Sequence, residues 1–550
     1  MEEKLQLGKK IIYSSEEVDD IFKLIYKEKL DDLVSYISNE QNEIWNIKRG
    51  DDITLLHSAC VFDKSEIIEI IIKETKNRLK LNNENTLTNE EREKNKEIFN
   101  NFINAKTKAD RLTALHYSSF RGNIKIIKLL IENNADINAL TYNGLNMIHK
   151  AAQGNKPSGI IYFNKKYNMD LEVGENKENL NAMHLAAISG MDNSVIFLLS
   201  LGMNPNIQDN QGYTALHYAV KYNHIRIIKK LLQKGARKDI RENKYNKTPA
   251  DMAKNNPEID EIFREKSICE KLFLKPDISS NNFYLKKNMI LSITLFIIII
   301  IPIFFVLFPF FNNTFFSISY LIISFIIFVL FLLLKYSNPG IMINEQYTDL
   351  LDIVEKEEDA ENFCPYCLIK HKYKSKHCLI CKKCIEEFDH HCFWVGNCVG
   401  KNNYSLFFIF LIYVNLNVLL NIYITFFYLL NEIISPYKNK DNNSFPGFIF
   451  GINSFIYHKV NRLLVSIFIC CIGIIFLIPL IKLFIKQLFI AFERRRHRID
   501  EEEYEKNRLT EKLEEENEND ENVIKVNLDE EIWGDIVYRK ESTDIADKGK

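Results

Sequence analysis

The sequence predicts a mainly α-helical protein. We expect a repeat solenoid, then a four-helix transmembrane domain with a zinc-binding cysteine-rich domain on its cytosolic side. Three observations predict this order: a unit of about 33 residues recurs in the first half, four long apolar runs follow, and seven of the eleven cysteines cluster between two of those runs. The net charge of -2 gives no reason to expect nucleic acid as a partner.

The first half repeats a short polar motif before each helical stretch. Its clearest copies are Thr113-Ala114-Leu115-His116 and Thr214-Ala215-Leu216-His217, and further copies end at His57, His149, His184 and Asp251. The positions 116, 149, 184, 217 and 251 are 33, 35, 33 and 34 residues apart. Each copy leads into a helix, a turn rich in Gly and Asn, and a second apolar helix. This period predicts a stack of helix pairs that buries one continuous core.

The period and the T-x-L-H tetrapeptide resemble ankyrin repeats. The resemblance implies that the histidines and threonines are structural and form hydrogen bonds within and between repeats. It also implies a concave face, which we interpret as a protein-docking surface; a plain spacer is the alternative. The longer step from position 57 to 116 predicts an insertion near 76–104, poor in apolar periodicity, which we expect to be a solvated loop or a partly helical excursion.

Four apolar runs are long enough to cross about 30 Å of hydrocarbon. The lysines and arginines that flank them all fall on one side, which predicts a cytosolic location for that side. The repeats, the cysteine cluster and the C-terminal tail therefore share the cytosol, where thiols stay reduced. The expected spans are 289–311, 315–334, 405–430 and 463–484.

The cysteine cluster contains enough ligands for two closed tetrahedral zinc sites. One thiol, Cys392, is then left over beside His390 and Asp389, and a thiol next to a base and a carboxylate is a nucleophile arrangement. A zinc-stabilised fold without catalysis is the alternative. The eight candidate ligands are Cys364, Cys367, His377, Cys378, Cys381, Cys384, His391 and Cys398.

The spacing C-x2-C-x9-H-C-x2-C-x2-C-x4-D-H-H-C-x5-C-x4-N-x3-F, which ends at Asn403 and Phe407, resembles that of the DHHC protein S-acyltransferases. The resemblance implies that Cys392 accepts the acyl group, that His390 is its base and that Asp389 orients His390. It implies palmitoyl-CoA as the donor and membrane-associated proteins, recruited by the repeats, as acceptors. It also pairs the ligands: one structural zinc ion with Cys364, Cys367, His377 and Cys384, the other with Cys378, Cys381, His391 and Cys398.

The family resemblance further implies a multi-pass protein of the endomembrane system, with the Golgi as the habitual compartment.

Two flanking motifs depart from the family pattern: Asn338-Pro339-Gly340 replaces Asp-Pro-Gly, and Ile490-Ala491-Phe492-Glu493 keeps only the acid of Thr-Thr-x-Glu. Lysines 370, 372, 374 and 376 are candidates for binding the phosphates of CoA, or else form a solvated basic loop near anionic lipid. A non-enzymatic ankyrin scaffold with a structural zinc module is the competing function.

These readings divide the chain as follows: a helical segment (1–50), about six repeats with the insertion (51–265), a linker (266–288), transmembrane helices 1 and 2 (289–334), the cysteine-rich domain (335–404), transmembrane helices 3 and 4 with a lumenal loop (405–484), and a charged cytosolic tail (485–550).

Overall fold

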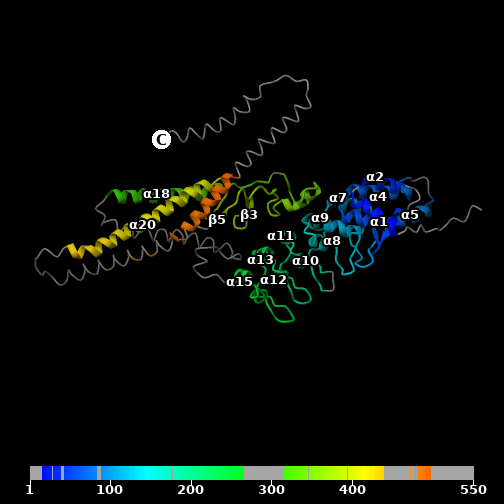
Figure 1. Ribbon diagram of the computed structural model, residues 1–550, viewed down its shortest axis with the longest axis horizontal. Coiled ribbons are helices and arrows are strands. Elements are labelled where there is room, and N and C mark those ends of the chain that lie inside the picture. The colour runs from blue at the N-terminus through cyan, green and yellow to red at the C-terminus, as the bar shows by residue number, and fades with distance from the viewer. Residues whose placement is uncertain are drawn as a thin grey trace, which may run out of the picture. The chain divides into compact units, whose positions relative to one another are not determined.

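A computed structural model gives the fold (Figure 1). It describes residues 15–27, 29–38, 43–82, 88–174, 178–264, 314–344, 346–392, 394–438, 467, 471, 477–478 and 480–496. The chain divides into two compact units. The first comprises Met1–Ile303 with Phe328–Phe407, and the second comprises Phe304–Ile327 with Phe408–Lys550.

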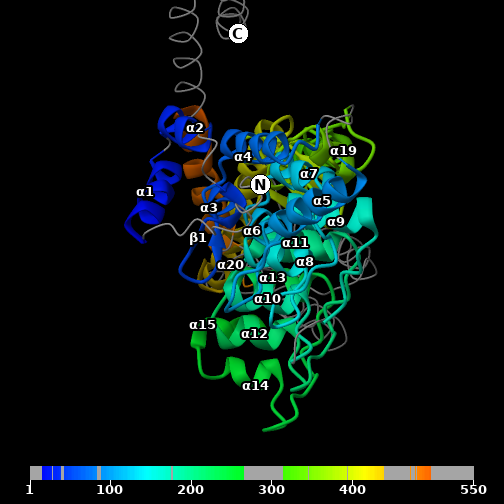
Figure 2. The same ribbon diagram turned by 90° about the vertical axis from the view of Figure 1, so that its right-hand side faces the viewer.

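The repeats form two layers of helices in the first unit. Each first helix contacts the first helix of the next repeat, and each second helix packs behind its own first helix (Figure 2). The first-helix layer contains α3 (Leu55–Val61), α6 (Ala114–Arg121), α8 (Met147–Gln153), α10 (Ala182–Ser189), α12 (Ala215–Lys221) and α14 (Pro249–Ala253). The second-helix layer contains α4 (Ser65–Arg78), α7 (Ile124–Glu132), α9 (Pro157–Tyr167), α11 (Asp192–Ser200), α13 (Ile225–Gln233) and α15 (Pro257–Phe263).

Short elements close the N-terminal end of this stack. Helices α1 (Ser15–Tyr26) and α2 (Leu30–Ser38) contact α3 and α4 and bury apolar side chains such as Ile25 and Leu33 in the common core. A turn of 3-10 helix, η1 (Ile44–Asn46), and a two-stranded antiparallel pair, β1 (Lys48–Arg49) with β2 (Ile53–Thr54), lead into α3. The array therefore begins with its own capping helices, which repeat stacks need to cover an exposed apolar end.

The repeated histidines are structural, as predicted. In the second complete copy, the His116 backbone N–H donates to Thr113 Oγ1, and His116 Nδ1 lies 2.8 Å from the same oxygen. The other ring nitrogen, Nε2, lies 3.3 Å from the Leu145 carbonyl oxygen in the next repeat. The His116 ring thus closes a reciprocal cap on its own helix and joins neighbouring repeats. Burial lowers the pKa of His57, His116 and His149 to about 4, so these rings are neutral near pH 7.

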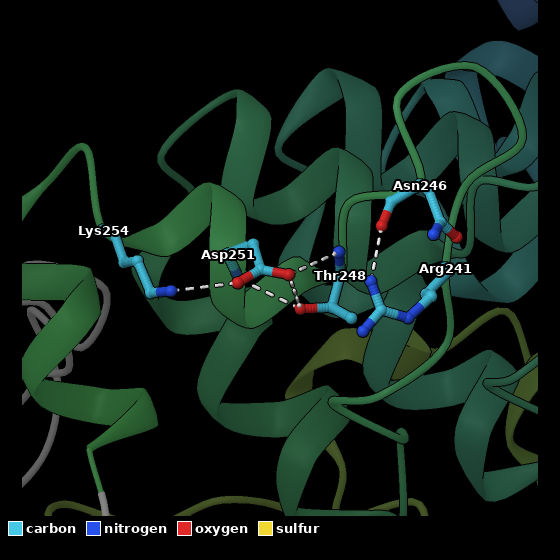
Figure 3. Close-up of polar contacts among 5 residues, drawn as sticks. All are labelled: Arg241, Asn246, Thr248, Asp251 and Lys254. Atoms are coloured by element: carbon cyan, nitrogen blue, oxygen red, sulfur yellow. Dashed lines mark hydrogen bonds and ion pairs between the residues drawn. The ribbon is translucent and has the colours of Figure 1, made fainter.

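The last copy substitutes a carboxylate for the histidine and keeps the same cap (Figure 3). Thr248 Oγ1 donates to Asp251 Oδ2 at 2.9 Å, and the Asp251 backbone N–H donates to Thr248 Oγ1 at 3.1 Å. Lys254 Nζ donates to the other carboxylate oxygen at 3.0 Å. No further repeat follows α14 and α15 in the described array, so a charged residue at this terminal copy suits its exposed position.

The expected insertion is a built part of the array. It contains α5 (Asn89–Ile103), which begins with a capping box between Thr88 and Glu91. Phe99, Phe102 and Ile103 are buried in the common core. Of the two expected forms, the structure agrees with the partly helical excursion and not with a solvated loop over this helix. Its apolar side chains gather in the last turn, where a short stretch shows little periodicity.

Between the two apolar helices described below lies a small module with little regular structure. It contains α19 (Leu350–Glu355), the 3-10 turn η4 (Ala360–Asn362), and two antiparallel hairpins. The first hairpin pairs β3 (Lys376–Cys378) with β4 (Lys383–Ile385), and the second pairs β5 (His390–Cys392) with β6 (Asn397–Val399).

Two long apolar helices flank this module, α18 (Thr314–Tyr336) and α20 (Tyr404–Lys438). Within the described residues, one stretch passes the length and hydropathy criteria for a membrane span: Tyr404–Tyr423 in α20, with a mean hydropathy of 2.0. The apolar part of α18, Leu321–Tyr336, is shorter. Residues 289–311, and the tail from 497 onward, lie outside the described part, and the stretch 463–484 is described only in pieces. The structure therefore does not establish four spans.

Candidate functional site

The two hairpins of the cysteine-rich module use the same device to bring distant ligands together. In the first hairpin His377 pairs with Cys384 across the strands, and in the second His391 pairs with Cys398. Side chains directly opposite each other in an antiparallel pair lie on the same face. Each hairpin therefore presents one imidazole and one thiol side by side, ready for two further cysteines.

The remaining cysteines complete two groups of four. Cys364, Cys367, His377 and Cys384 form the first, here called site I, and Cys378, Cys381, His391 and Cys398 form the second, called site II. Within each group all ligand atoms lie within 4.8 Å of one another. These are the two sets that the family resemblance implies.

The distances within each group fit a tetrahedral zinc ion. In site I, the sulfurs of Cys364, Cys367 and Cys384 lie 3.6, 3.2 and 3.8 Å from His377 Nδ1. In site II, the three corresponding distances to His391 Nδ1 are 3.8, 3.4 and 3.5 Å. Zn–S and Zn–N bonds of ordinary length place a sulfur and a nitrogen about 3.6 Å apart in a tetrahedron. Three thiols and one imidazole are also the donors that zinc prefers.

Strand geometry assigns different surroundings to the two adjacent histidines. Successive side chains of a strand point to opposite faces, so His391 lies on the face of site II while its neighbours His390 and Cys392 share the other face of β5. The same alternation separates His377, in site I, from Cys378, in site II. Strand β3 thus contributes one ligand to each zinc site, and β5 contributes one ligand to site II and two residues to its opposite face.

The face opposite site II carries the candidate catalytic group. His390 Nδ1 lies 3.1 Å from Asp389 Oδ2, and Cys392 is 7% exposed. Burial by itself lowers the pKa of His390, but the hydrogen bond to Asp389 and the adjacent Cys392 raise it to about 9. The ring of Phe407 meets the His390 imidazole edge-on at 5.3 Å. A buried thiol and an imidazole on one face of a strand, with a carboxylate hydrogen-bonded to the imidazole, can perform nucleophilic chemistry.

Two asparagines hold this hairpin to the end of α18, and sequence reasoning gave neither of them a role. Asn397, opposite Cys392 in the ladder, donates through Nδ2 to the carbonyl oxygens of Leu334 and Ser337, both at 2.9 Å, and of Lys335 at 3.3 Å. Asn403 donates to Ser337 Oγ and to the Cys398 carbonyl oxygen, both at 2.9 Å. Asn403 stands in the family spacing, whereas Asn397, the first residue of β6, carries no signal beyond its place next to Cys398.

The unusual Asn338 keeps the turn after α18. Its Oδ1 accepts hydrogen bonds from the backbone N–H groups of Gly340 and Ile341, both at 3.0 Å. An aspartate could accept the same two bonds, so the amide replaces the carboxylate in this turn. Of the second unusual motif, Ile490 to Glu493, the structure describes a helix.

The candidate lysines for CoA binding are partly paired with acids. Lys370 Nζ lies 3.0 Å from Glu358 Oε2, and Lys372 Nζ lies 4.0 Å from Glu386 Oε1. Lys374 lies over the Tyr373 ring. The structure therefore provides a mixed-charge loop here.

Comparison with known proteins agrees with this geometry. Residues 357–504 match the family model of DHHC palmitoyltransferases, and residues 90–173 and 159–242 match ankyrin repeats. The human palmitoyltransferase ZDHHC17 is 27% identical over 278 residues, which cover 44% of this chain and 43% of that protein. Palmitoyltransferase Hip14 of Drosophila melanogaster is 38% identical over 101 residues, covering 17% and 16% of the two chains.

A fungal relative shows the same similarity over a shorter stretch. Palmitoyltransferase akr1 of Emericella nidulans is 38% identical over 94 residues, which cover 17% of this chain and 13% of that protein. The chain thus matches less than half the length of each of these curated relatives.

Proposed function

Because the chain carries a DHHC palmitoyltransferase domain behind ankyrin repeats, we propose that it is a protein S-palmitoyltransferase. The observation that carries this proposal is the face of β5 opposite site II. Six of the seven cysteines of the module, with His377 and His391, are candidate metal ligands. The seventh cysteine, Cys392, is left over and lies beside the His390–Asp389 pair.

The reaction follows from the chemistry of a thiol and a thioester. The Cys392 thiolate attacks the carbonyl carbon of a long-chain acyl-CoA, the new C–S bond forms, and the CoA thiolate leaves and takes up a proton. A thiolate of a substrate protein then attacks the acyl-enzyme, and Cys392 is released. His390 accepts and returns the proton, and Asp389 orients its ring, which is the division of labour of other base-activated nucleophiles.

The two zinc ions have a structural role in this proposal. Sites I and II each offer four protein ligands, which leaves no open position for substrate. Bound zinc would tie the two hairpins into one fold, because a module with so little regular structure has a small apolar core of its own. The ligands must be deprotonated thiols and neutral imidazoles, as in other structural zinc sites.

We place the protein in an internal membrane of the cell, with four spans and with the repeats and the zinc module on the cytosolic side. Support comes from the apolar helices α18 and α20, from the flanking lysines and arginines, and from the zinc-ligating thiols, which need a reducing compartment. The Golgi is the compartment that family habit suggests.

The array supplies the docking surface for protein substrates in this proposal. The turns that precede its first helices carry exposed side chains, among them Tyr142 at 63% and Tyr245 at 61%. Aromatic residues that protrude from a rigid scaffold are suited to anchoring a protein partner. Lys221, at the end of α12, lies over the rings of Tyr213 and Tyr222 and adds positive charge to the same layer.

The replacement Cys392→Ser tests the assignment. Purified protein is incubated with labelled palmitoyl-CoA, and hydroxylamine-sensitive label on the chain is measured. We expect wild-type protein and the control Cys471→Ser to be labelled and Cys392→Ser to remain unlabelled, with unchanged zinc content. Equal labelling of Cys392→Ser and wild type would overturn the proposal and favour the scaffold.

A further inference from the structure

The stretch between α18 and the zinc module packs against the second-helix layer of the repeats. Helix α19 and the turn η4 both contact α9. Leu350, Ile353, Val354, Ala360 and Phe363 are buried in the same continuous core as the repeats. The Ala360 backbone N–H donates to Ser158 Oγ on α9 at 3.2 Å in a buried position. This packing has the properties of a built interface rather than of a chance surface contact.

The two sides of this contact have opposite charge. On the repeats, Lys166 Nζ lies 2.7 Å from Glu355 Oε1, and Lys128 Nζ donates to the Glu355 carbonyl oxygen at 3.1 Å. Glu361 lies 3.8 Å from Lys156 Nζ and accepts a hydrogen bond from Asn193 Nδ2 at 3.3 Å. Each pair is partly exposed and therefore contributes little alone. In every pair, however, the lysine belongs to the repeats and the glutamate to the opposite segment, and this complementarity fixes the orientation of the contact.

A second contact leads from the repeats directly to site I. Lys234, at the end of α13, holds its ammonium 3.9 Å from the centre of the Tyr366 ring. The Tyr366 ring lies 5.0 Å from the imidazole of His377, a site I ligand, at an angle of 36°. Tyr366 itself stands between the ligands Cys364 and Cys367. One ammonium, one aromatic ring and one zinc ligand thus form a continuous row.

The charge of site I explains why lysines stand there. Three thiolates and one neutral imidazole around a Zn²⁺ ion leave a net charge of about -1. Lys230 and Lys234, both from α13, interact electrostatically with Cys364. Lys376, in the hairpin, opposes Lys230, and Lys230 in turn opposes Lys234; Lys234 is the one whose ammonium lies against the aromatic ring beside the site.

We propose that the ankyrin array is a structural part of the zinc module: α13 supplies the cations that balance the anionic site I, and α9 and α11 hold the segment 349–363 that leads into it. The array is then a docked subdomain that keeps site I ordered, and a bound substrate protein is held at a set position relative to the module. This inference rests on the zinc assignment made above and is independent of acyl transfer.

The test removes the two cations and keeps their aliphatic stems. The double variant Lys230→Met/Lys234→Met is compared with wild type and with Lys229→Met, which changes an exposed lysine of the same helix. Release of zinc from the full-length protein to a coloured chelator is followed with time, together with amide hydrogen exchange in the peptide 362–378. We expect at least threefold faster release and exchange in the double variant, and wild-type behaviour in Lys229→Met.

A coupling measurement separates docking from loss of fold. If Lys234 acts through Tyr366, then Lys234→Met should accelerate zinc release in the wild-type background and have no further effect in a Tyr366→Leu background. Additive effects of the two changes, or identical release rates in all the lysine variants, would overturn the inference. Wild-type protein that holds no zinc would contradict the zinc assignment itself. If, in addition, amide hydrogen exchange in the peptide 362–378 were the same in the double variant and in wild type, the docking would be rejected as well.

Discussion

Asn397 lies directly opposite Cys392 in the β5–β6 ladder, and its side-chain amide donates to three carbonyl oxygens at the end of α18. The last carbonyls of a helix have no partner within the helix. Asn397 satisfies several of them at once and also accepts from the Cys398 backbone N–H at 2.8 Å through Oδ1. The candidate nucleophile is thereby held at a set depth relative to the helix that precedes the module.

This relationship predicts that Asn397→Ala slows formation of the acyl-enzyme at unchanged zinc content. The three contacts that Nδ2 donates and the one bond that Oδ1 accepts are all lost, and each net bond contributes about 1 kcal/mol. Asn397→Asp, which keeps the acceptor and lacks the donors, should be equally slow, because the donors make the contacts with α18. Single-turnover labelling with palmitoyl-CoA measures the rate, and Asn402→Ala, which changes an exposed asparagine in the turn between β6 and α20, is the control. A rate for Asn397→Asp near that of wild type would refute the positioning role.

We expect Asp389→Asn to reduce the rate of acyl-enzyme formation by roughly 10²-fold or more, the usual size of a general-base contribution. The hydrogen bond from His390 Nδ1 to Asp389 Oδ2 orients the imidazole and raises its pKa, and an amide supports neither effect as well. Glu386→Gln is the matched control, since Glu386 is paired with Lys401 at 3.0 Å and lies three residues away. Equal rates for Asp389→Asn and Glu386→Gln would remove Asp389 from the proposed mechanism.

Replacement of one zinc ligand should remove one metal ion and leave the repeats folded. Cys384 is buried and lies opposite His377 in the first hairpin, so Cys384→Ser should lower the zinc content from two ions per chain to one. Elemental analysis of the purified protein gives the count. The exposed Cys471 offers the control Cys471→Ser, for which two ions are expected. Two ions in both variants would contradict the ligand set of site I.

Acid should destabilise the ankyrin array below about pH 6.5. Burial lowers the pKa of His57, His116 and His149 to about 4 in the folded state, whereas the unfolded chain titrates near 6.5. The unfolded state therefore binds more protons between these values, and stability falls as the pH drops from about 6.5 to about 4, by up to about 1.4 kcal/mol per pH unit for each histidine.

Pulse proteolysis in urea measures this effect on the array. We expect the urea midpoint of the array to be constant between pH 7 and 8 and to fall steadily from pH 6 to pH 5. The variant His116→Gln should show a smaller fall over the same interval, because it has one fewer group to protonate. A midpoint that is independent of pH between 7 and 5 would show that these rings do not couple to folding.

Much of this protein was determined by local sequence patterns. The T-x-L-H period places the helix pairs because each histidine caps the helix in which it stands, which is a contact over three residues. The two C-x-x-C pairs and the long apolar runs are likewise short-range signals. They predicted the repeats, the zinc-type ligands and the left-over thiol. They did not show that α5 is anchored in the core, because its three buried side chains are too few to show a period.

Only the tertiary structure decided which residues distant in the sequence contact one another. Spacing alone counts eight ligands, but the hairpin registers His377–Cys384 and His391–Cys398 divide them, and strand alternation leaves His390 beside Cys392. Likewise the contact of Lys234 with Tyr366 joins residues 132 positions apart. Such pairings depend on how separate elements pack. The entropic cost of closing a loop grows only slowly with its length, so loops of different lengths can bring the same residues together and no local pattern records them.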